Sequence, residues 1–235
     1  YWRLTRDRAL VNELWPVLVK LLDRFAEDIA GDGLIRSQPG RRLFLDWAPV
    51  SRQEPNAVYN LHYLLALQTA ATLAGELAVG GDAARWREQA ERLSAACRAA
   101  FLQDDRWWDD LSHTTASQLA AAFAVLTGAA DADEQPAQLD AIAARSLDLD
   151  DNPQPGALVL ASPFMHHYLF AALHAGGWEP AVVEIIRRRW GRWVEAGCPT
   201  TWENWNVDFP DGSTCHAFSA HPLYHLYKVA QSLPL

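Results

Sequence analysis

The sequence predicts an all-α protein, a toroid in which helical hairpins place one ring of helices inside another. Ala and Leu, which favour helix, are abundant throughout the chain. No run of alternating polar and apolar residues indicates a strand, so we expect less than about a tenth of the chain in strands. Charged and uncharged helical segments alternate along the sequence, and short and long connections alternate with them.

We expect eight helices, which divide into two kinds by their charge. The segments that carry charged residues along their length are 7–30, 83–102, 136–146 and 180–196. The segments with little or no charge are 56–79, 113–127, 163–176 and 220–232. A helix that is apolar all round is buried on all sides, and an amphipathic helix lies outside it. The second kind is therefore expected to form the inner ring and the first kind the outer ring, in four hairpins.

Composition narrows the classes of function. The chain has 235 residues, half of them hydrophobic, which excludes intrinsic disorder and allows one large core. Its net charge of −9 is a poor match for nucleic acid or an anionic membrane, and no apolar run is long enough to span a bilayer. Three cysteines without CxxC spacing argue against a disulfide framework and a structural zinc site. Eleven tryptophans offer large flat surfaces, which suit sugar rings.

The long connections are predicted to bring the candidate site residues to one rim of the toroid. Loops 31–55, 103–112, 147–162 and 197–219 all enter inner helices at their N-termini, whereas the opposite turns are short. Long loops in a compact domain usually carry function. The aromatic and ionisable residues that these loops bring to the rim are Asp46, Trp47, Trp107, Trp108, Trp202, Glu203, Trp205 and His216.

Carboxylates beside indoles are the parts of a glycosidase site, where one carboxyl group acts as acid and another as base or nucleophile. Glu203, between Trp202 and Trp205, is the best catalytic candidate; the alternative is a surface Glu beside core tryptophans. Asp46 is the second candidate, and its alternative is a loop carboxylate satisfied by backbone N–H groups. Trp107 and Trp108 form either a platform for the sugar or a plug at the end of a hairpin.

The histidines give weaker signals. His216 could hydrogen-bond a sugar hydroxyl or orient Glu203, and a structural role is about as well supported. His221 and His225 have the i, i+4 spacing of some metal ligands, but no HExxH pattern accompanies them, so packing or hydrogen bonding is favoured and no metal is predicted. GxGxxG, P-loop and GxSxG motifs are absent from the sequence, so no cofactor is predicted.

Two segments near the end of the chain resemble a known family. The run Gly197-Cys198-Pro199-Thr200-Thr201-Trp202-Glu203-Asn204-Trp205 and the run Asp211-Gly212-Ser213-Thr214-Cys215-His216-Ala217-Phe218-Ser219 are similar to the end of the catalytic domain of α-L-rhamnosidases, family 78 of the glycoside hydrolases. Tyr1 to Asp7 with Trp15-Pro16, Phe44-Leu45-Asp46-Trp47, and Ser162-Pro163-Phe164 with His174-Ala175-Gly176-Gly177 match the family more loosely. The similarity covers nearly the whole chain, and only the Thr-Thr-Trp-Glu and His-Ala-Phe segments are specific.

The resemblance implies an (α/α)6 six-hairpin toroid and an inverting glycosidase that removes terminal sugars from oligosaccharides or glycosides. Glu203 matches the general base, His216 matches a sugar contact, and Asp46 and Trp47 match a loop beside the bound sugar. The substrate-binding residues that we expect are Asp46, Trp47, Trp107, Trp108, Trp202, Trp205 and His216. Alternatives are another six-hairpin glycosidase, trehalase-like or a glucuronyl hydrolase, and a non-catalytic toroid that binds carbohydrate or protein.

The chain also departs from the family's pattern. The acidic, Arg-containing motif that supplies the family's general acid is absent from it, as are four of the twelve helices and the usual β-domains. Residues 1–235 are therefore expected to form a single, incomplete catalytic-domain fragment, whose partner is the remainder of its own chain. Alone it should hydrolyse almost nothing, and its four hairpins should leave apolar inner helices exposed.

Overall fold

A computed structural model describes residues 1–40, 43–77, 80–150, 155–205 and 212–232. The described chain is mostly helical, as the sequence predicts. The strands are the two-residue pair β1 (Leu102–Gln103) and β2 (Arg106–Trp107), which is antiparallel. Among the described helices, none combines the length and the apolar character that crossing a membrane requires.

The helices follow the predicted order, with small shifts at their ends. They are α1 (Trp2–Thr5), α2 (Arg8–Ala26), α3 (Ala57–Leu77), α4 (Gly80–Phe101), α5 (Gln118–Thr127), α6 (Gln135–Leu147), α7 (His166–Ala175), α8 (Glu179–Ile185), the π-helical turn η1 (Ile186–Trp190), α9 (Gly191–Glu195), the 3-10 turn η2 (Ala217–Ala220) and α10 (Pro222–Ser232). Segment 180–196 thus contains a π turn, and α5 begins at Gln118, where Ser117 caps it by accepting from the Ala120 N–H.

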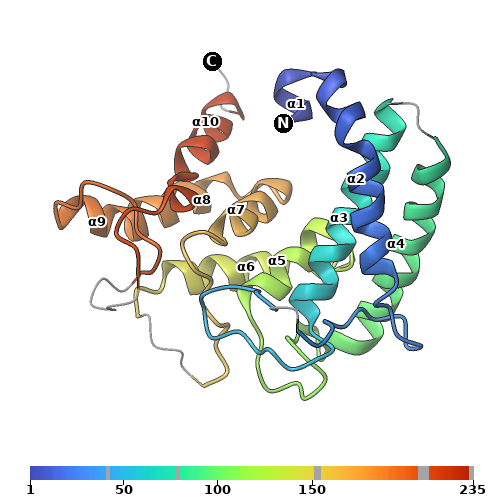
Figure 1. Cartoon of the computed structure of the whole chain (residues 1–235). Coiled ribbons are helices and arrows are strands. Elements are labelled where there is room, and N and C mark those ends of the chain that lie inside the picture. The colour runs from blue at the N-terminus through green and yellow to red at the C-terminus, as the bar shows by residue number, and fades with distance from the viewer. Residues whose placement is uncertain (41–42, 78–79, 151–154, 206–211, 233–235) are drawn as a thin grey trace.

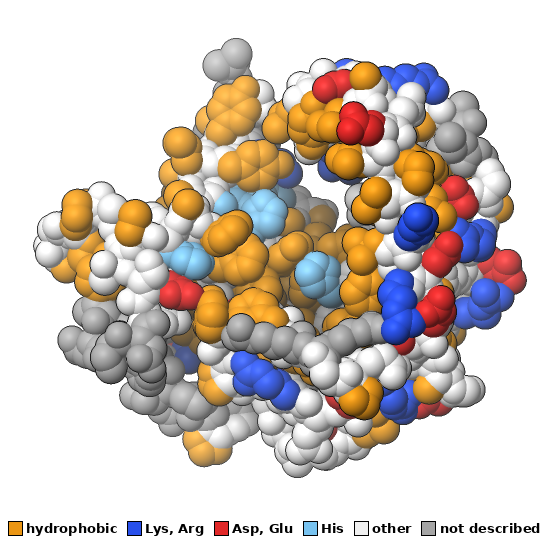
Figure 2. Space-filling model, in the orientation of Figure 1, with side chains coloured by type: hydrophobic (Ala, Val, Ile, Leu, Met, Phe, Trp, Pro, Cys, Tyr) orange, Lys and Arg blue, Asp and Glu red, His pale blue; other side chains and the backbone are white. Residues whose placement is uncertain are grey.

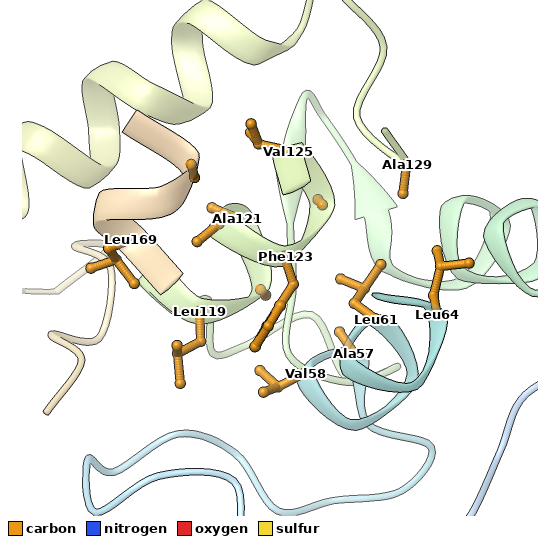
Figure 3. Close-up of a cluster of buried hydrophobic side chains, with 14 of the residues drawn as sticks. Ala57, Val58, Leu61, Leu64, Leu119, Ala121, Phe123, Val125, Ala129 and Leu169 are labelled. Carbon is orange, nitrogen blue, oxygen red and sulfur yellow. The ribbon is translucent and has the colours of Figure 1, made fainter. Parts of the chain in front are cut away.

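Helices α3, α5 and α7 form the inner layer. Every residue of α5 except Leu126 is buried, and α3 and α7 bury most of their apolar side chains. Figure 3 shows side chains of α3 (Val58, Leu61), α5 (Leu119, Phe123) and α7 (Leu169) meeting in one cluster. Burial of these uncharged helices is the favourable hydrophobic term that the charge pattern predicts.

Helices α4, α6 and α8 form the outer layer. The buried side chains of α4 make a single stripe with helical spacing: Ala83, Trp86, Ala90, Leu93, Cys97 and Phe101. The chain places α4 beside α3, α6 beside α5 and α8 beside α7, while α3, α5 and α7 contact one another in order (Figure 1). The expectation that segment 113–127 is more buried than segment 83–102 is confirmed, and the hairpin arrangement accounts for it.

The two ends of the arc differ from its middle. Segment 220–232 is expected to be an inner helix, but α10 exposes Leu223 (78%) and Tyr227 (61%). At the other end, α2 exposes Leu14 and Val17. Figure 1 shows α2 and α10 at opposite ends of the arc, so each lacks a neighbour on one side. Among the predicted inner helices, α10 thus shows the exposed apolar residues that the sequence predicts, whereas α3, α5 and α7 are mostly buried.

Candidate functional site

The loops that enter α3, α5 and α7 are tied to one another at one rim of the arc. Bridges join Asn56 to Asp110 and Ser117 to Val159, and the Ala57 N–H donates to the Asp109 carbonyl over 2.8 Å. In Figure 1 the loops before α3 and α5 run along one edge of the molecule. These ties give the rim a fixed geometry, on which side chains from distant parts of the sequence can be positioned.

Asp46 is fully buried beneath this rim. One carboxylate oxygen accepts from the Trp47 N–H over 2.7 Å, and the other accepts from the Ser162 N–H over 2.9 Å. Burial raises the pKa of Asp46 above its usual value, and the hydrogen bonds from Ser162 and Trp47 oppose that rise. Asp46 thus joins the loop before α3 to the loop before α7. This is the arrangement of a loop carboxylate satisfied by backbone N–H groups.

Glu203 and His216 lie on two segments that pair with each other. The Glu203 N–H donates to the Ser213 carbonyl over 2.9 Å, and the Ser213 N–H donates to Glu203 Oε2 over 2.8 Å. The His216 N–H donates to the Thr201 carbonyl over 2.8 Å, and the Thr201 hydroxyl donates to the His216 carbonyl over 2.9 Å. Both Glu203 and His216 are half-buried. The two family-like segments are therefore side by side; Asp211 lies outside the described residues.

The tryptophans around Glu203 belong to an aromatic stack. Trp205 stacks on Trp193 with ring centres 5.5 Å apart, and its indole N–H donates to the Ala161 carbonyl over 2.8 Å. Trp202 is tilted against Trp193 at 6.3 Å, and its buried indole N–H has no hydrogen-bond partner in the described chain. These contacts hold Trp202 and Trp205 against α9 and against the loop that precedes α7.

A cavity of about 140 Å³ lies between this stack and the Asp46 loop. Trp47, Pro49, Ser162, Pro163 and Trp205 contribute to its wall, and Trp47 is 45% exposed. Arg145 also lines the cavity. The sequence places Arg145 in the charged segment 136–146, which is predicted to be an outer helix. Its neighbours Ile142 and Ser146 lie on the buried face of α6, and Arg145 is buried with them. The cavity brings Trp47 and Trp205 together, although 158 positions separate them.

Trp107 and Trp108 are not at this cavity. Trp107 is fully buried in the core, so its ring has no surface left for a ligand. Trp108 is half-buried, donates from its indole to the Gln103 carbonyl over 3.2 Å, and lies under the Arg106 guanidinium at 4.9 Å. Both residues lie at the β1–β2 pair in the connection between α4 and α5, which corresponds to the plug rather than the platform.

Two further groups of titratable residues lie outside the predicted set. Asp109 is fully buried and accepts from the Ser117 hydroxyl over 2.6 Å; burial raises its pKa to about 6, while hydrogen bonds from Ser117 and Ser51 oppose the rise. Within the described residues, one group of side chains is close enough to hold a metal ion: His167, His221 and His225.

Comparison with known proteins shows what the chain is similar to. Residues 1–230 match the family described as bacterial alpha-L-rhamnosidase 6 hairpin glycosidase domain. A rhamnosidase of family GH78 from Bacillus sp. GL1 superposes with a TM-score of 0.79 at 25% identity, over 95% of this chain and 24% of that protein. A rhamnosidase from Klebsiella oxytoca with rhamnose bound superposes with a TM-score of 0.79 at 22% identity, over 98% of this chain and 44% of that protein. The chain thus spans less than half of these relatives, and no match is found among curated proteins.

Proposed function

The chain belongs to the bacterial α-L-rhamnosidase six-hairpin glycosidase family, and from that premise we propose that it carries the general base of an inverting α-L-rhamnosidase. The substrate is a terminal sugar of the rhamnose class on an oligosaccharide or glycoside. The rhamnose in the Klebsiella oxytoca relative supports this class of ligand. The indoles of Trp47 and Trp205, which line the cavity, support it as well, because an indole offers a flat apolar surface that suits a sugar ring. Glu203 does not line the cavity; it lies two positions before Trp205 in the sequence.

The observation that carries the proposal is the pairing of residues 200–203 with residues 213–216. It orients Glu203 through Ser213, since the Ser213 N–H holds Oε2, while no described residue donates to Oε1. Oε1 can therefore hold the water that attacks the anomeric carbon. Glu203 takes the proton of that water, the new C–O bond forms, and the bond to the leaving group breaks on the opposite face.

Inversion sets a spacing for this chemistry. The water must fit between the base and the sugar, so base and acid lie roughly 6.5–9.5 Å apart in inverting glycosidases. The acid protonates the leaving oxygen, and it must be a second carboxyl group. Asp46 is a poor candidate for that role, because both its oxygens accept backbone N–H groups below the cavity. We assign Asp46 to positioning Trp47 and Ser162.

The remaining predicted residues divide between the sugar and the scaffold. Trp47 and Trp205 are proposed to contact the apolar face of the sugar, because both line the cavity. His216 is proposed to hydrogen-bond a hydroxyl. Trp202 is proposed to shape the surroundings of Glu203, while Trp107 and Trp108 hold the connection between α4 and α5, away from the sugar.

Stereochemistry tests the proposal. The protein, expressed with whatever sequence naturally precedes Tyr1, is given an aryl α-L-rhamnoside, and proton NMR follows the first-formed sugar. We expect rhamnose in the inverted, β configuration. A retained anomer, or a preference for an aryl glucoside or glucuronide, would contradict the assignment. Rhamnose binding without any hydrolysis would instead indicate a carbohydrate-binding toroid.

A further inference from the structure

Three histidines from two helical regions converge on the inner side of the C-terminal half. His167 lies in α7, His221 directly precedes α10, and His225 lies one turn further along. The i, i+4 spacing places His221 and His225 on one face of α10, and packing against α7 adds His167. Figure 2 shows histidines among hydrophobic side chains in the hollow between the α2–α4 side and the α7–α10 side.

The spacing of the three rings matches a tetrahedral metal site. Their ring centres are 5.0 Å (His167–His225), 5.4 Å (His221–His225) and 5.5 Å (His167–His221) apart. Zinc–nitrogen bonds of about 2.0–2.1 Å in a tetrahedron place ring centres roughly 5.2 Å apart and ligand nitrogens roughly 3.3 Å apart. His225 Nε2 and His167 Nδ1 are already 3.1 Å apart, and one ligand nitrogen of each ring lies within 4.8 Å of the others. The wider separations, of up to 4.8 Å, would have to shorten when an ion binds.

His221 has the tautomer that a metal ligand needs. Its Nε2 lies 2.8 Å from the Pro163 carbonyl, and because a carbonyl only accepts, Nε2 carries the proton. Its Nδ1 is therefore a lone pair, and this buried atom has no hydrogen-bond partner in the described residues. Metal-binding histidines usually donate their second nitrogen to a carbonyl or carboxylate in this way. A cation would satisfy an atom that is otherwise buried at a cost.

Burial also favours the neutral form of the three rings, in support of a site that their geometry indicates. Burial lowers the pKa of His221 to about 4 and that of His225 to about 2, and it lowers the pKa of His167 as well. The charged groups around them are few: Lys228 on α10, whose positive charge lowers the pKa of His167 and His225, and Glu179, which lies 3.9 Å from His174, the ring stacked on His225. Neutral imidazole binds a divalent cation without first losing a proton.

We propose that His167, His221 and His225 form a three-histidine zinc site that clamps α10 to α7. Imidazole nitrogens suit Zn²⁺, and three protein ligands leave one coordination position for water. The clamp would add to the packing of α10, which buries Val229 and exposes Leu223 and Tyr227. A purely aromatic, hydrogen-bonded histidine cluster is the alternative.

Metal titration distinguishes the two. Untagged protein is stripped with a chelator and titrated with Zn²⁺ by calorimetry and with Co²⁺ by visible absorbance. We expect one ion per chain, the strong d–d bands of tetrahedral Co²⁺, and a higher Tm with Zn²⁺. His225→Gln and His167→Gln should each lower the affinity at least about 100-fold, beyond what loss of an outer partner causes. His62→Gln is the matched control, because His62 stacks on Phe123 in another part of the inner surface.

Two results would overturn the proposal of a zinc site. Absence of Zn²⁺ and Co²⁺ binding by the wild-type protein would show a histidine cluster without a metal. Binding that survives both His167→Gln and His225→Gln would place the ion elsewhere. If His225→Gln fails to fold, His167→Gln decides alone, since His167 is only half-buried.

Discussion

Two segments of the rim each carry a carboxylate beside a tryptophan, and they differ in what the carboxylate can reach. Asp46 is fully buried, and both of its oxygens are occupied by backbone N–H groups. Glu203 is half-buried, and only Oε2 is held, by the Ser213 N–H. A saturated carboxylate fixes loops in place, whereas a partly satisfied one is able to hold a water. From this difference we propose a structural role for Asp46 and a catalytic role for Glu203.

The largest expected effect is on catalysis at Glu203. Glu203→Gln keeps the shape and the hydrogen bond to Ser213 but removes the base, so kcat should fall about 10²–10⁴-fold. The Tm should stay at the wild-type value. Hydrolysis of an aryl rhamnoside, by the protein expressed with whatever sequence naturally precedes Tyr1, measures kcat, and thermal unfolding measures the Tm. Glu195→Gln, at the exposed end of α9, is the control. A Glu203→Gln variant with the kcat of the wild type would show that Glu203 is not the base, and the two carboxylates would no longer differ in role.

Asp46 should show the reverse pattern, with stability affected first. Asp46→Ala removes the acceptor of the Trp47 and Ser162 N–H groups, and leaving the buried Ser162 N–H unpaired costs about 1–3 kcal/mol. The free energy of unfolding, measured with urea, should fall accordingly, and Asp46→Asn should lose less because its amide oxygen still accepts. If Asp46→Ala is as stable as the wild type, the two hydrogen bonds do not hold the loops.

Asp109 extends the comparison to a second buried carboxylate of the rim. Its pKa is about 6 when folded, against an ordinary value of 3.8. The folded state therefore binds the proton more tightly, so this group's stabilising contribution is complete below about pH 4 and is lost as the pH rises through 6. The difference in unfolding free energy between wild type and Asp109→Asn should change by roughly 1–3 kcal/mol between pH 4.5 and pH 7. A difference independent of pH would contradict the shift.

The smallest expected effect concerns the sugar contact at Trp47. Trp47→Ala should weaken rhamnose binding about 2–10-fold, because an exposed indole contributes about 0.5–1.5 kcal/mol through ring stacking. Calorimetric titration with rhamnose measures it. Trp108→Ala is the control, because Trp108 lies beside Arg106 and away from the cavity, so this variant should bind rhamnose as tightly as the wild type. An equal loss of affinity in both variants would indicate that Trp108 also contacts the sugar.

Charge alternation predicts the layers of the fold because burial excludes unpaired charges: uncharged α5 is inside and charged α4 is outside. The same pattern is wrong about the burial of α10, since periodicity reports an apolar face but not whether a neighbour covers it. It also cannot separate Trp107 in the core from Trp47 on the surface, because the two indoles look alike in sequence. The hydrogen bond from the Ser162 N–H to Asp46 joins residues 116 positions apart, and no local sequence motif predicts such a contact.

Azide rescue tests the central claim, that Glu203 activates the attacking water. Azide is an anionic nucleophile that needs no base, so it can replace that water in Glu203→Ala, where the shortened side chain leaves room. The account predicts turnover of an aryl rhamnoside that rises with azide concentration in Glu203→Ala but not in Asp46→Ala, with a rhamnosyl azide of inverted configuration as the product. Absence of azide-dependent turnover in Glu203→Ala, or an azide product of retained configuration, would contradict it.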